Sequence, residues 1–291
     1  MSNPDSMTGA IIAEGLPGTG VLYVVATPIG NLEDISARAL RILGEVALIA
    51  AEDTRTTRVL LDRYCITTPM QAVHEHNERG QAERLVARLR AGDSIALVSD
   101  AGTPLINDPG FHLVAAARAA GLSVQPIPGA CAGIAALSVA GLAADRFCFE
   151  GFLPPKSGAR RARLDDLVSE ERTLLFYESS HRIVDCIDDM VAIFGPQRRA
   201  VVARELTKRF ETLIGDTLAD IATAIASDSD QSRGEFVVVV AGNPDVDAAS
   251  LAEGRRLYAA LSRELPPARA AKIAAELSGA SKRALYGSPQ D

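Results

Sequence analysis

Short runs of apolar and largely β-branched residues recur between positions 21 and 241. They cover residues 21–26, 46–51, 94–99, 123–127, 173–177, 200–203 and 236–241. Unbroken apolar character over such short runs is typical of strands buried on both faces of a sheet. We therefore predict a strand at each run.

The segments between these runs have helical spacing. Residues 36–43 and 78–90 are examples, and in the second Leu85, Val86 and Leu89 recur at intervals of three and four. Strands that alternate with helices indicate the α/β class, with a largely parallel sheet.

The alternation is interrupted at 151–167, where Pro154-Pro155, glycine and four basic residues favour an exposed connection between two domains. After residue 244 the strands stop, and 251–261 and 268–277 are predicted to be two short helices separated by Pro266-Pro267. We therefore predict a flexible arm (1–20), an N-terminal α/β domain (21–148), a C-terminal α/β domain (149–244) and a small helical tail (250–291).

Composition excludes several classes of protein. No run approaches the roughly 18 apolar residues of a membrane span, and the first 20 residues lack the pattern of a signal peptide. We therefore expect a cytoplasmic protein. The four cysteines form no CxxC pair, and His74 and His76 have no third ligand in the sequence, so no metal is predicted.

The formal net charge of -7 argues against a surface coated with positive charge, although residues 250–291 carry +3 and the remainder -10. Four cations near the predicted connection fit contacts to RNA phosphates, and a solvated linker is an equal alternative. These cations are Lys156, Arg160, Arg161 and Arg163.

Four predicted strands are followed directly by loops rich in small or rigid residues. In open α/β sheets, ligands bind outside the carboxyl ends of the strands, and small residues let the backbone approach a ligand closely. Each loop alone is also compatible with an ordinary turn, but four together predict a pocket. No G-x-G-x-x-G follows a strand, so a dinucleotide site is disfavoured.

The motifs TPIGNLEDIS, AEDTR, SDAGTPLINDPG, IPGACA, FEGFLPPK, FYESSHR and ARELTK follow one another in this order. From about residue 21 to 242 the chain resembles the tetrapyrrole-methylase fold family, and within it the enzymes that methylate a cytidine 2′-hydroxyl of small-subunit (16S) ribosomal RNA. The tail also resembles the small helical domain that ends those chains.

The resemblance implies two α/β domains with S-adenosylmethionine in the cleft between them, a homodimer, ribosomal RNA in the assembled small subunit as partner, and no metal. It also implies which loops line the methyl donor. The residues carried over by motif are Pro28, Gly30, Asn31, Asp100, Ala101, Gly102, Thr103, Pro104, Gly129, Ala130, Cys131 and Ala132.

Methyl transfer to an alcohol needs a group that accepts the hydroxyl proton. Three candidates remain open. Glu178 follows a strand but can equally pair with Arg182, and Asp53 can equally cap a helix. Lys208 would serve only if burial or nearby arginines depressed its pKa.

Two other functions are compatible with the same loops. A methyltransferase acting on a tetrapyrrole or another small molecule would share the donor site and differ in its acceptor. A noncatalytic RNA-binding factor for ribosome assembly would use the fold without transfer, and the intact donor-like loops argue against that alternative.

Overall fold

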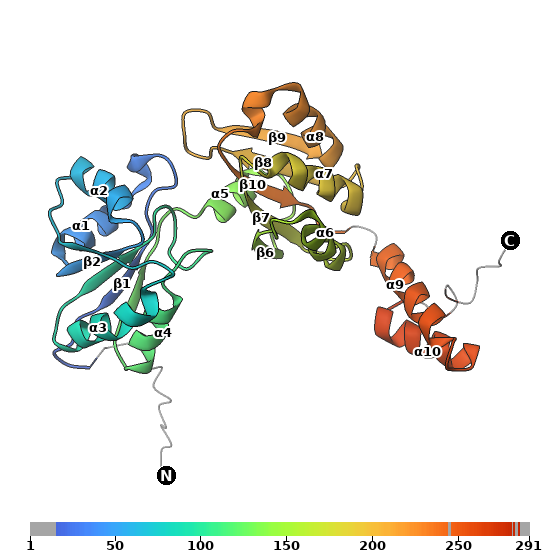
Figure 1. Ribbon diagram of the computed structural model, residues 1–291, viewed down its shortest axis with the longest axis horizontal. Coiled ribbons are helices and arrows are strands. Elements are labelled where there is room, and N and C mark those ends of the chain that lie inside the picture. Colours follow the sequence, from blue (N-terminus) through green and yellow to red (C-terminus); the bar gives the residue numbers. More distant parts are fainter. Residues whose placement is uncertain (1–15, 244–245, 281, 283–284, 286–291) are drawn as a thin grey trace, which may run out of the picture. The chain divides into compact units, whose positions relative to one another are not determined.

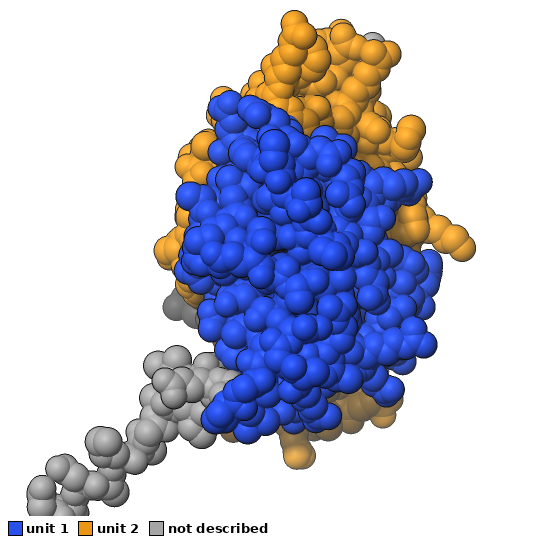
Figure 2. All heavy atoms as spheres, turned by 90° about the vertical axis from the view of Figure 1, so that its left-hand side faces the viewer, with its two compact units in different colours: residues 1–132 blue, residues 133–291 orange. Residues whose placement is uncertain are grey.

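The computed structural model describes residues 16–243, 246–280, 282 and 285, which form two compact units, Met1–Ala132 (unit 1) and Gly133–Asp291 (unit 2) (Figures 1 and 2). Most of the predicted arm, 1–20, lies outside the described residues. The division comes before the predicted boundary at 148. One reason is that α5 (Ala132–Val139) is tied to the second sheet, since the Gly133 amide donates to the Tyr177 hydroxyl at 3.1 Å.

Unit 1 is built on a five-stranded sheet in which every pairing is parallel and the order is β3-β2-β4-β1-β5. The strands are β1 (Leu22–Val25), β2 (Leu48–Ala51), β3 (Met70–Ala72), β4 (Ile95–Val98) and β5 (Val124–Ile127). Four were predicted from the apolar runs. The edge strand β3 was missed because it has only three residues, all partly exposed.

Helices cover both faces of this sheet. The helices α1 (Ala37–Glu45) and α2 (Thr54–Arg63) pack on one face, and α3 (Glu78–Arg90) and α4 (Phe111–Ala119) on the other. The chain therefore leaves the neighbouring strands β1 and β4 toward opposite faces. This point is a topological switch, where open α/β sheets bind ligands.

Unit 2 contains a mixed sheet in the order β6-β7-β10-β8-β9, in which only β6 and β7 are parallel. The strands are β6 (Phe147–Phe152), β7 (Thr173–Ser179), β8 (Arg199–Arg204), β9 (Thr212–Thr217) and β10 (Glu235–Val240). The sequence pattern identified β7, β8 and β10. It missed the two edge strands, since β6 contains a bulge between Phe149 and Gly151 and β9 has few buried positions.

The segment 151–167 is not the exposed connection that was predicted. It forms the end of β6 and the helix α6 (Ser157–Asp166), which packs with α7 (Ile183–Phe194) and α8 (Leu218–Ser227) around the core of unit 2. The two prolines end the strand, and Leu164 is fully buried. Proline and charge there mark a strand-to-helix turn within the unit.

The predicted tail helices are present as α9 (Val246–Leu261) and α10 (Pro267–Ser278), which pack together around Ala274, Ala280 and Leu285. The last part of the predicted tail, residues 286–291, lies outside the described residues. Short 3-10 turns occur at Leu32–Asp34 and Ser229–Ser232. No helix in the described part of the chain is both long and apolar enough to cross a bilayer.

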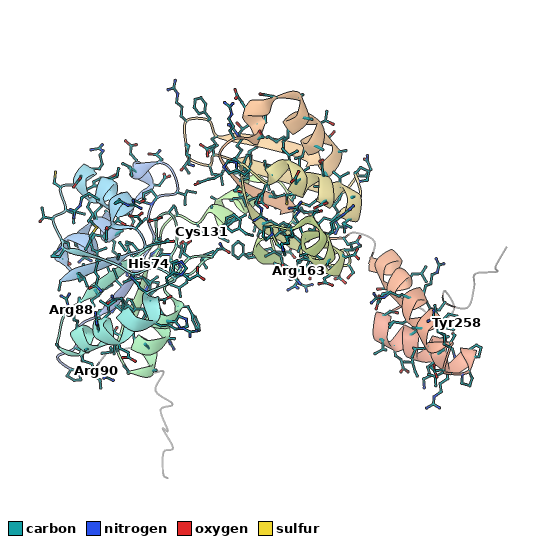
Figure 3. The ribbon with its side chains drawn as sticks, in the orientation of Figure 1. His74, Arg88, Arg90, Cys131, Arg163 and Tyr258 are labelled. Carbon is teal, nitrogen blue, oxygen red and sulfur yellow. The ribbon has the colours of Figure 1, made fainter. Side chains whose placement is uncertain are left out.

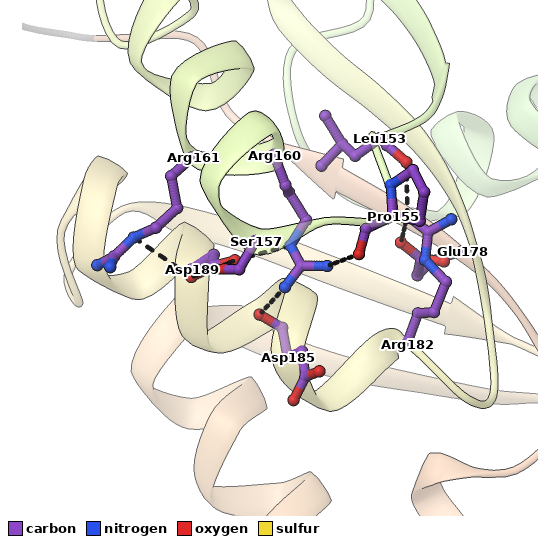
Figure 4. Close-up of polar contacts among 9 residues, drawn as sticks. All are labelled: Leu153, Pro155, Ser157, Arg160, Arg161, Glu178, Arg182, Asp185 and Asp189. Carbon is purple, nitrogen blue, oxygen red and sulfur yellow. Dashed lines mark hydrogen bonds and ion pairs between the residues drawn. The ribbon is translucent and has the colours of Figure 1, made fainter.

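A buried ion pair joins α6 to α7 (Figure 4). Arg160 is 3% exposed, and its Nε donates to Asp189 Oδ2 at 2.7 Å. Asp189 also accepts from the Ser157 hydroxyl at 3.0 Å, and the Arg160 guanidinium also donates to the Asp185 carbonyl at 3.3 Å. These bonds offset the cost of removing both charges from water.

We expect Asp189→Ala to lower the free energy of unfolding by about 3–5 kcal/mol, because it leaves the Arg160 charge buried without its partner. Urea unfolding followed by far-ultraviolet circular dichroism measures the change. The double replacement Arg160→Met with Asp189→Leu removes both charges and should regain most of this stability. A decrease below about 1 kcal/mol for the single variant would contradict this account.

Candidate functional site

Two loops meet at the switch point of unit 1. The Thr27 amide donates to the Gly102 carbonyl at 2.8 Å, and the Gly102 amide donates to the Thr27 carbonyl at 3.0 Å. The Thr27 hydroxyl also donates to the Ser99 carbonyl at 3.3 Å. These bonds join the loop after β1 to the loop after β4 and fix the backbone of both predicted donor segments.

The loop after β5 is held to the same edge. The Thr103 hydroxyl donates to the Ala130 carbonyl at 2.9 Å. Gly102 has φ +82°, a conformation that favours glycine, and a Cβ there would lie 3.3 Å from Ile29 Cγ2. A Cβ on Gly129 would lie 2.9 Å from Ala26 Cβ. The structure thus brings together the three loops carried over by motif. The third of them contains Cys131, which Figure 3 labels.

Acidic side chains follow β2 and β4 at this edge. The Asp53 amide donates to Asp100 Oδ1 at 3.1 Å, and the Asp100 amide donates to Glu52 Oε2 at 3.2 Å. Burial raises the pKa of Glu52 and of Asp100 above their ordinary values. Burial, together with the charges of Glu52 and Asp100, raises the pKa of Asp108 to about 6.

The residue-by-residue prediction included Asp100 and left out Glu52 and Asp108. Both belong to the motifs AEDTR and SDAGTPLINDPG, and Glu52 directly follows the buried strand β2, so strand-end position was the signal that could have found it. Carboxylates that are only partly solvated favour a nearby positive charge. This edge can therefore stabilise a cationic ligand.

We expect Asp108→Asn to stabilise the protein at pH 7.5 by about 2 kcal/mol, because the full pKa shift is worth about 3 kcal/mol and partial exposure of the side chain to solvent reduces this. The pKa of Asp108 in the folded protein, about 6, lies above the ordinary value of 3.8. The contribution of the protonated Asp108 to the stability of the wild type is therefore fully present at low pH and is lost as pH rises through this range. Thermal unfolding of both proteins from pH 4 to 7.5 tests it. Parallel stability curves would show that Asp108 is not perturbed.

Asp53 is poorly suited to accept a proton. Its carboxylate caps α2 by accepting from the Arg55 amide at 2.8 Å, and it forms an ion pair with the Arg55 guanidinium at 2.5 Å. The hydrogen bonds from Arg55 lower the pKa of Asp53 to about 2. A carboxylate with such a low pKa is a weak base, so the capping role accounts for this residue.

Lys208 does not meet the condition set for it. Its ammonium donates to Glu205 Oε1 and Glu235 Oε2, each at 2.9 Å. Burial lowers the pKa of Lys208, but these two carboxylates outweigh burial and hold the pKa above its ordinary value. A lysine that stays charged has no lone pair with which to accept a proton.

Glu178 lies near the end of β7 with its side chain fully buried. Oε1 accepts from the Ser179 amide at 2.9 Å, and Oε2 lies 3.1 Å from Arg182 Nη2 (Figure 4). Oε2 has no hydrogen-bond partner of good geometry among the described residues. Of the three candidates, Glu178 is thus the one with an oxygen that accepts no hydrogen bond of good geometry from the described residues, although this oxygen is buried and pairs with Arg182.

The four predicted RNA-contacting cations have different environments. Lys156 is exposed. Arg161 lies 3.3 Å from Asp189 (Figure 4), and Arg163 pairs with Glu150 at 2.6 Å. About half of each arginine side chain is accessible to solvent. Arg160 is buried in its pair with Asp189. The expectation of an RNA contact at Arg160 is therefore corrected, because its guanidinium has no free surface.

Within the described ranges, no three His, Cys, Asp or Glu side chains are placed to hold a metal ion. The acidic group at the switch point is made of separate carboxylates that accept backbone hydrogen bonds.

Most of the chain matches models of known protein families. Residues 21–222 match the model described as Tetrapyrrole (Corrin/Porphyrin) Methylases, and residues 248–287 match the one described as RsmI C-terminal HTH domain. The chain is 60% identical over 268 residues to Ribosomal RNA small subunit methyltransferase I of Xylella fastidiosa, covering 92% of this chain and 98% of that protein. The Escherichia coli O157:H7 protein of the same name is 52% identical over 267 residues, covering 92% and 93%.

Solved structures share the fold. Uroporphyrin-III C-methyl transferase from Thermus thermophilus, complexed with S-adenyl homocysteine, aligns with a TM-score of 0.54 and 18% identity over 76% of this chain and 97% of that one. Diphthine synthase aligns with a TM-score of 0.55 and 16% identity over 76% and 90%. At this identity the likeness concerns the fold alone.

Proposed function

The chain belongs to the tetrapyrrole (corrin/porphyrin) methylase family, and we propose that it transfers the methyl group of S-adenosylmethionine to a cytidine 2′-hydroxyl of small-subunit ribosomal RNA. The observation that carries the proposal is the convergence of three donor-type loops at the switch point, in a chain 60% identical to a relative with a ribosomal name. A ribosomal substrate also accords with the cytoplasmic location expected from the sequence.

The residues at the switch point suit S-adenosylmethionine. Gly102 and Gly129 let the loops pack closely, because a Cβ at either position would crowd Ile29 or Ala26. The partly buried carboxylates of Asp100, Glu52 and Asp108 favour a cation. We propose that the loops 28–31, 100–104 and 129–132 hold the donor through backbone groups. These contacts do not depend on the hydroxyl side chains that Ala130, Cys131 and Ala132 lack.

The bound donor supplies a methyl group on a positively charged sulfur. The protein contributes mainly position, since holding the acceptor oxygen in line behind the methyl accounts for about 7–11 kcal/mol of barrier lowering in well-oriented reactions. The neighbouring carboxylates favour the charged donor before transfer. Exclusion of water when the acceptor binds favours the loss of that charge as the methyl leaves.

We propose that Glu178 accepts the hydroxyl proton. It is an ionisable group at a strand end of unit 2 whose Oε2 pairs with Arg182 but accepts no hydrogen bond of good geometry from the described residues. Asp53 and Lys208 are instead held by hydrogen-bonded ion pairs with Arg55 and with two glutamates. Arg182 balances the carboxylate charge before the proton arrives. Lys156, Arg161 and Arg163, with the basic tail, remain proposed contacts to RNA phosphates.

The alternative acceptor is a tetrapyrrole or another small molecule. The helical tail favours RNA, because residues 248–287 match a C-terminal HTH domain and the sequence there is basic. A noncatalytic role in ribosome assembly would leave the glycine-lined donor loops without a purpose.

We expect the protein to methylate small ribosomal subunits that lack the modification, using a donor labelled in its methyl group. The label should appear in an alkali-stable dinucleotide, because a methylated 2′-oxygen blocks alkaline cleavage of the adjacent phosphate. Glu178→Gln should lower the transfer rate about 10²–10⁴-fold, the usual contribution of a general base, with donor affinity preserved.

Calorimetric titration with the donor is the control, since it separates binding from chemistry. The conservative change Arg182→Lys retains a balancing charge and should lose less activity than Glu178→Gln. Label in a tetrapyrrole and none in RNA would establish the alternative acceptor. Unchanged transfer by Glu178→Gln would remove this residue from the reaction.

We also propose a homodimer, which the family resemblance implies. Sedimentation equilibrium at micromolar concentration should give a mass close to twice the chain mass of 30.7 kDa. A single species with the chain mass under these conditions would contradict the proposal.

A further inference from the structure

A hollow of about 440 Å³ lies in unit 2 at the end of the sheet where β6 and β7 begin and β10 ends. It is at the opposite end of β7 from Glu178. A second hollow of about 300 Å³ shares part of its lining. Three segments distant in sequence contribute the four arginines that we call the arginine pocket: Arg146, Arg172, Arg198 and Arg199.

One arginine of the pocket is neutralised within the protein. Arg172 donates to both carboxylate oxygens of Glu170, each at 2.7 Å. These hydrogen bonds lower the pKa of Glu170 to about 2. Arg172 therefore forms part of the wall of the pocket but adds little net charge to it.

Arg198 is held in place without an ion-pair partner among the described residues. Its guanidinium carbon lies 5.6 Å from the Phe194 ring centre, and Nη2 makes a long bond of 3.5 Å to the Val168 carbonyl. Its Nε is buried and has no acceptor among the described residues. Burial lowers the pKa of Arg198, which means that the charged form is incompletely stabilised and that an incoming anion would stabilise it.

Arg146 and Arg199 are exposed, and neither forms an ion pair within the described part of the chain. The acidic lining consists of Asp145 and Glu171. With Arg172 set aside, three arginines face two carboxylates, so this hollow is locally positive on a chain whose net charge is -7.

The pocket stands where the chain leaves the sheet for the tail. A Cβ on Gly242 would overlap the Glu171 carbonyl oxygen, so only glycine allows the chain after β10 to pass so close to the start of β7. The Asn243 amide then donates to the Glu170 carbonyl at 2.7 Å. The tail helix α9 begins shortly afterward, at Val246.

We propose that the arginine pocket binds a backbone phosphate of the RNA substrate, next to the point where the tail begins. The proposal rests on the proposed RNA substrate and adds a site remote from Glu178. Guanidinium groups suit it because they give two parallel donors to a phosphate and remain charged. The matched HTH domain that follows supplies the reason for RNA to pass this end of the sheet.

The test uses a double variant of the pocket, in which Arg146→Gln and Arg199→Gln are combined. The control is a second double variant, Arg41→Gln combined with Arg233→Gln, which removes the same amount of charge at two surface ion pairs. The probe is the small ribosomal subunit lacking the methyl group, with binding measured from about 50 to 300 mM salt. The pocket variant should bind at least about tenfold more weakly near 150 mM salt. Its salt slope should be shallower by about one for each phosphate that it no longer binds.

Donor affinity and kcat at saturating subunit should remain those of the wild type, so the defect appears in KM. The partly buried Arg198→Gln should weaken binding in the same direction, with circular dichroism as a check of folding. Wild-type affinity and slope in the double variant would overturn the proposal. A further outcome is that pyrophosphate stabilises the wild type but not the pocket variant, while both proteins bind the subunit equally well. This outcome would assign the pocket to a free anion and would also overturn the proposal.

The same measurements separate this proposal from the proposed function. A wild-type protein that binds subunits with a pocket-dependent slope but transfers no methyl group would contradict the activity and support the pocket. Transfer to subunits that is equal in wild type and variant at limiting subunit concentration would support the activity and contradict the pocket.

Discussion

The paired hydrogen bonds between Thr27 and Gly102 are the constraint on which the candidate site depends. They can form because β1 and β4 are parallel neighbours that end at the same edge, from which the chain departs toward opposite faces. With the two loops fixed, the third is positioned by Thr103 and Ala130. Gly102 and Gly129 are then required because the loops pack closely at these positions. The carboxylates lie at the same edge because their residues come after the ends of β2 and β4.

The charged groups of the chain are divided between the two units. The edge of unit 1 has acidic groups whose pKa values are raised by burial, and unit 2 has arginines at the far end of its sheet. A cationic donor and a polyanionic acceptor are thus favoured by different units. This separation reconciles an acidic protein with an RNA substrate, since attraction to RNA depends on local positive groups more than on the total charge.

Hydrophobic periodicity was sufficient to predict the central strands, because strands buried on both faces leave an unbroken apolar run, as β4 and β10 do. Edge strands such as β3 and β9 lack that pattern. That the loops proposed for the donor meet at one edge could be predicted, because position after a strand is a local property. The roles of Arg160 and Lys208 could not, because Asp189 and Glu235 lie far away in sequence and only the fold brings them near.

The Arg160–Asp189 pair also constrains how the sequence of this protein can evolve. Replacement of only one residue of the pair leaves the other charge buried without its partner. Replacement of both by apolar residues of similar volume costs little stability. A lineage would have to cross a poorly folded intermediate to exchange one arrangement for the other. The pair can therefore persist through descent even where it adds little to stability.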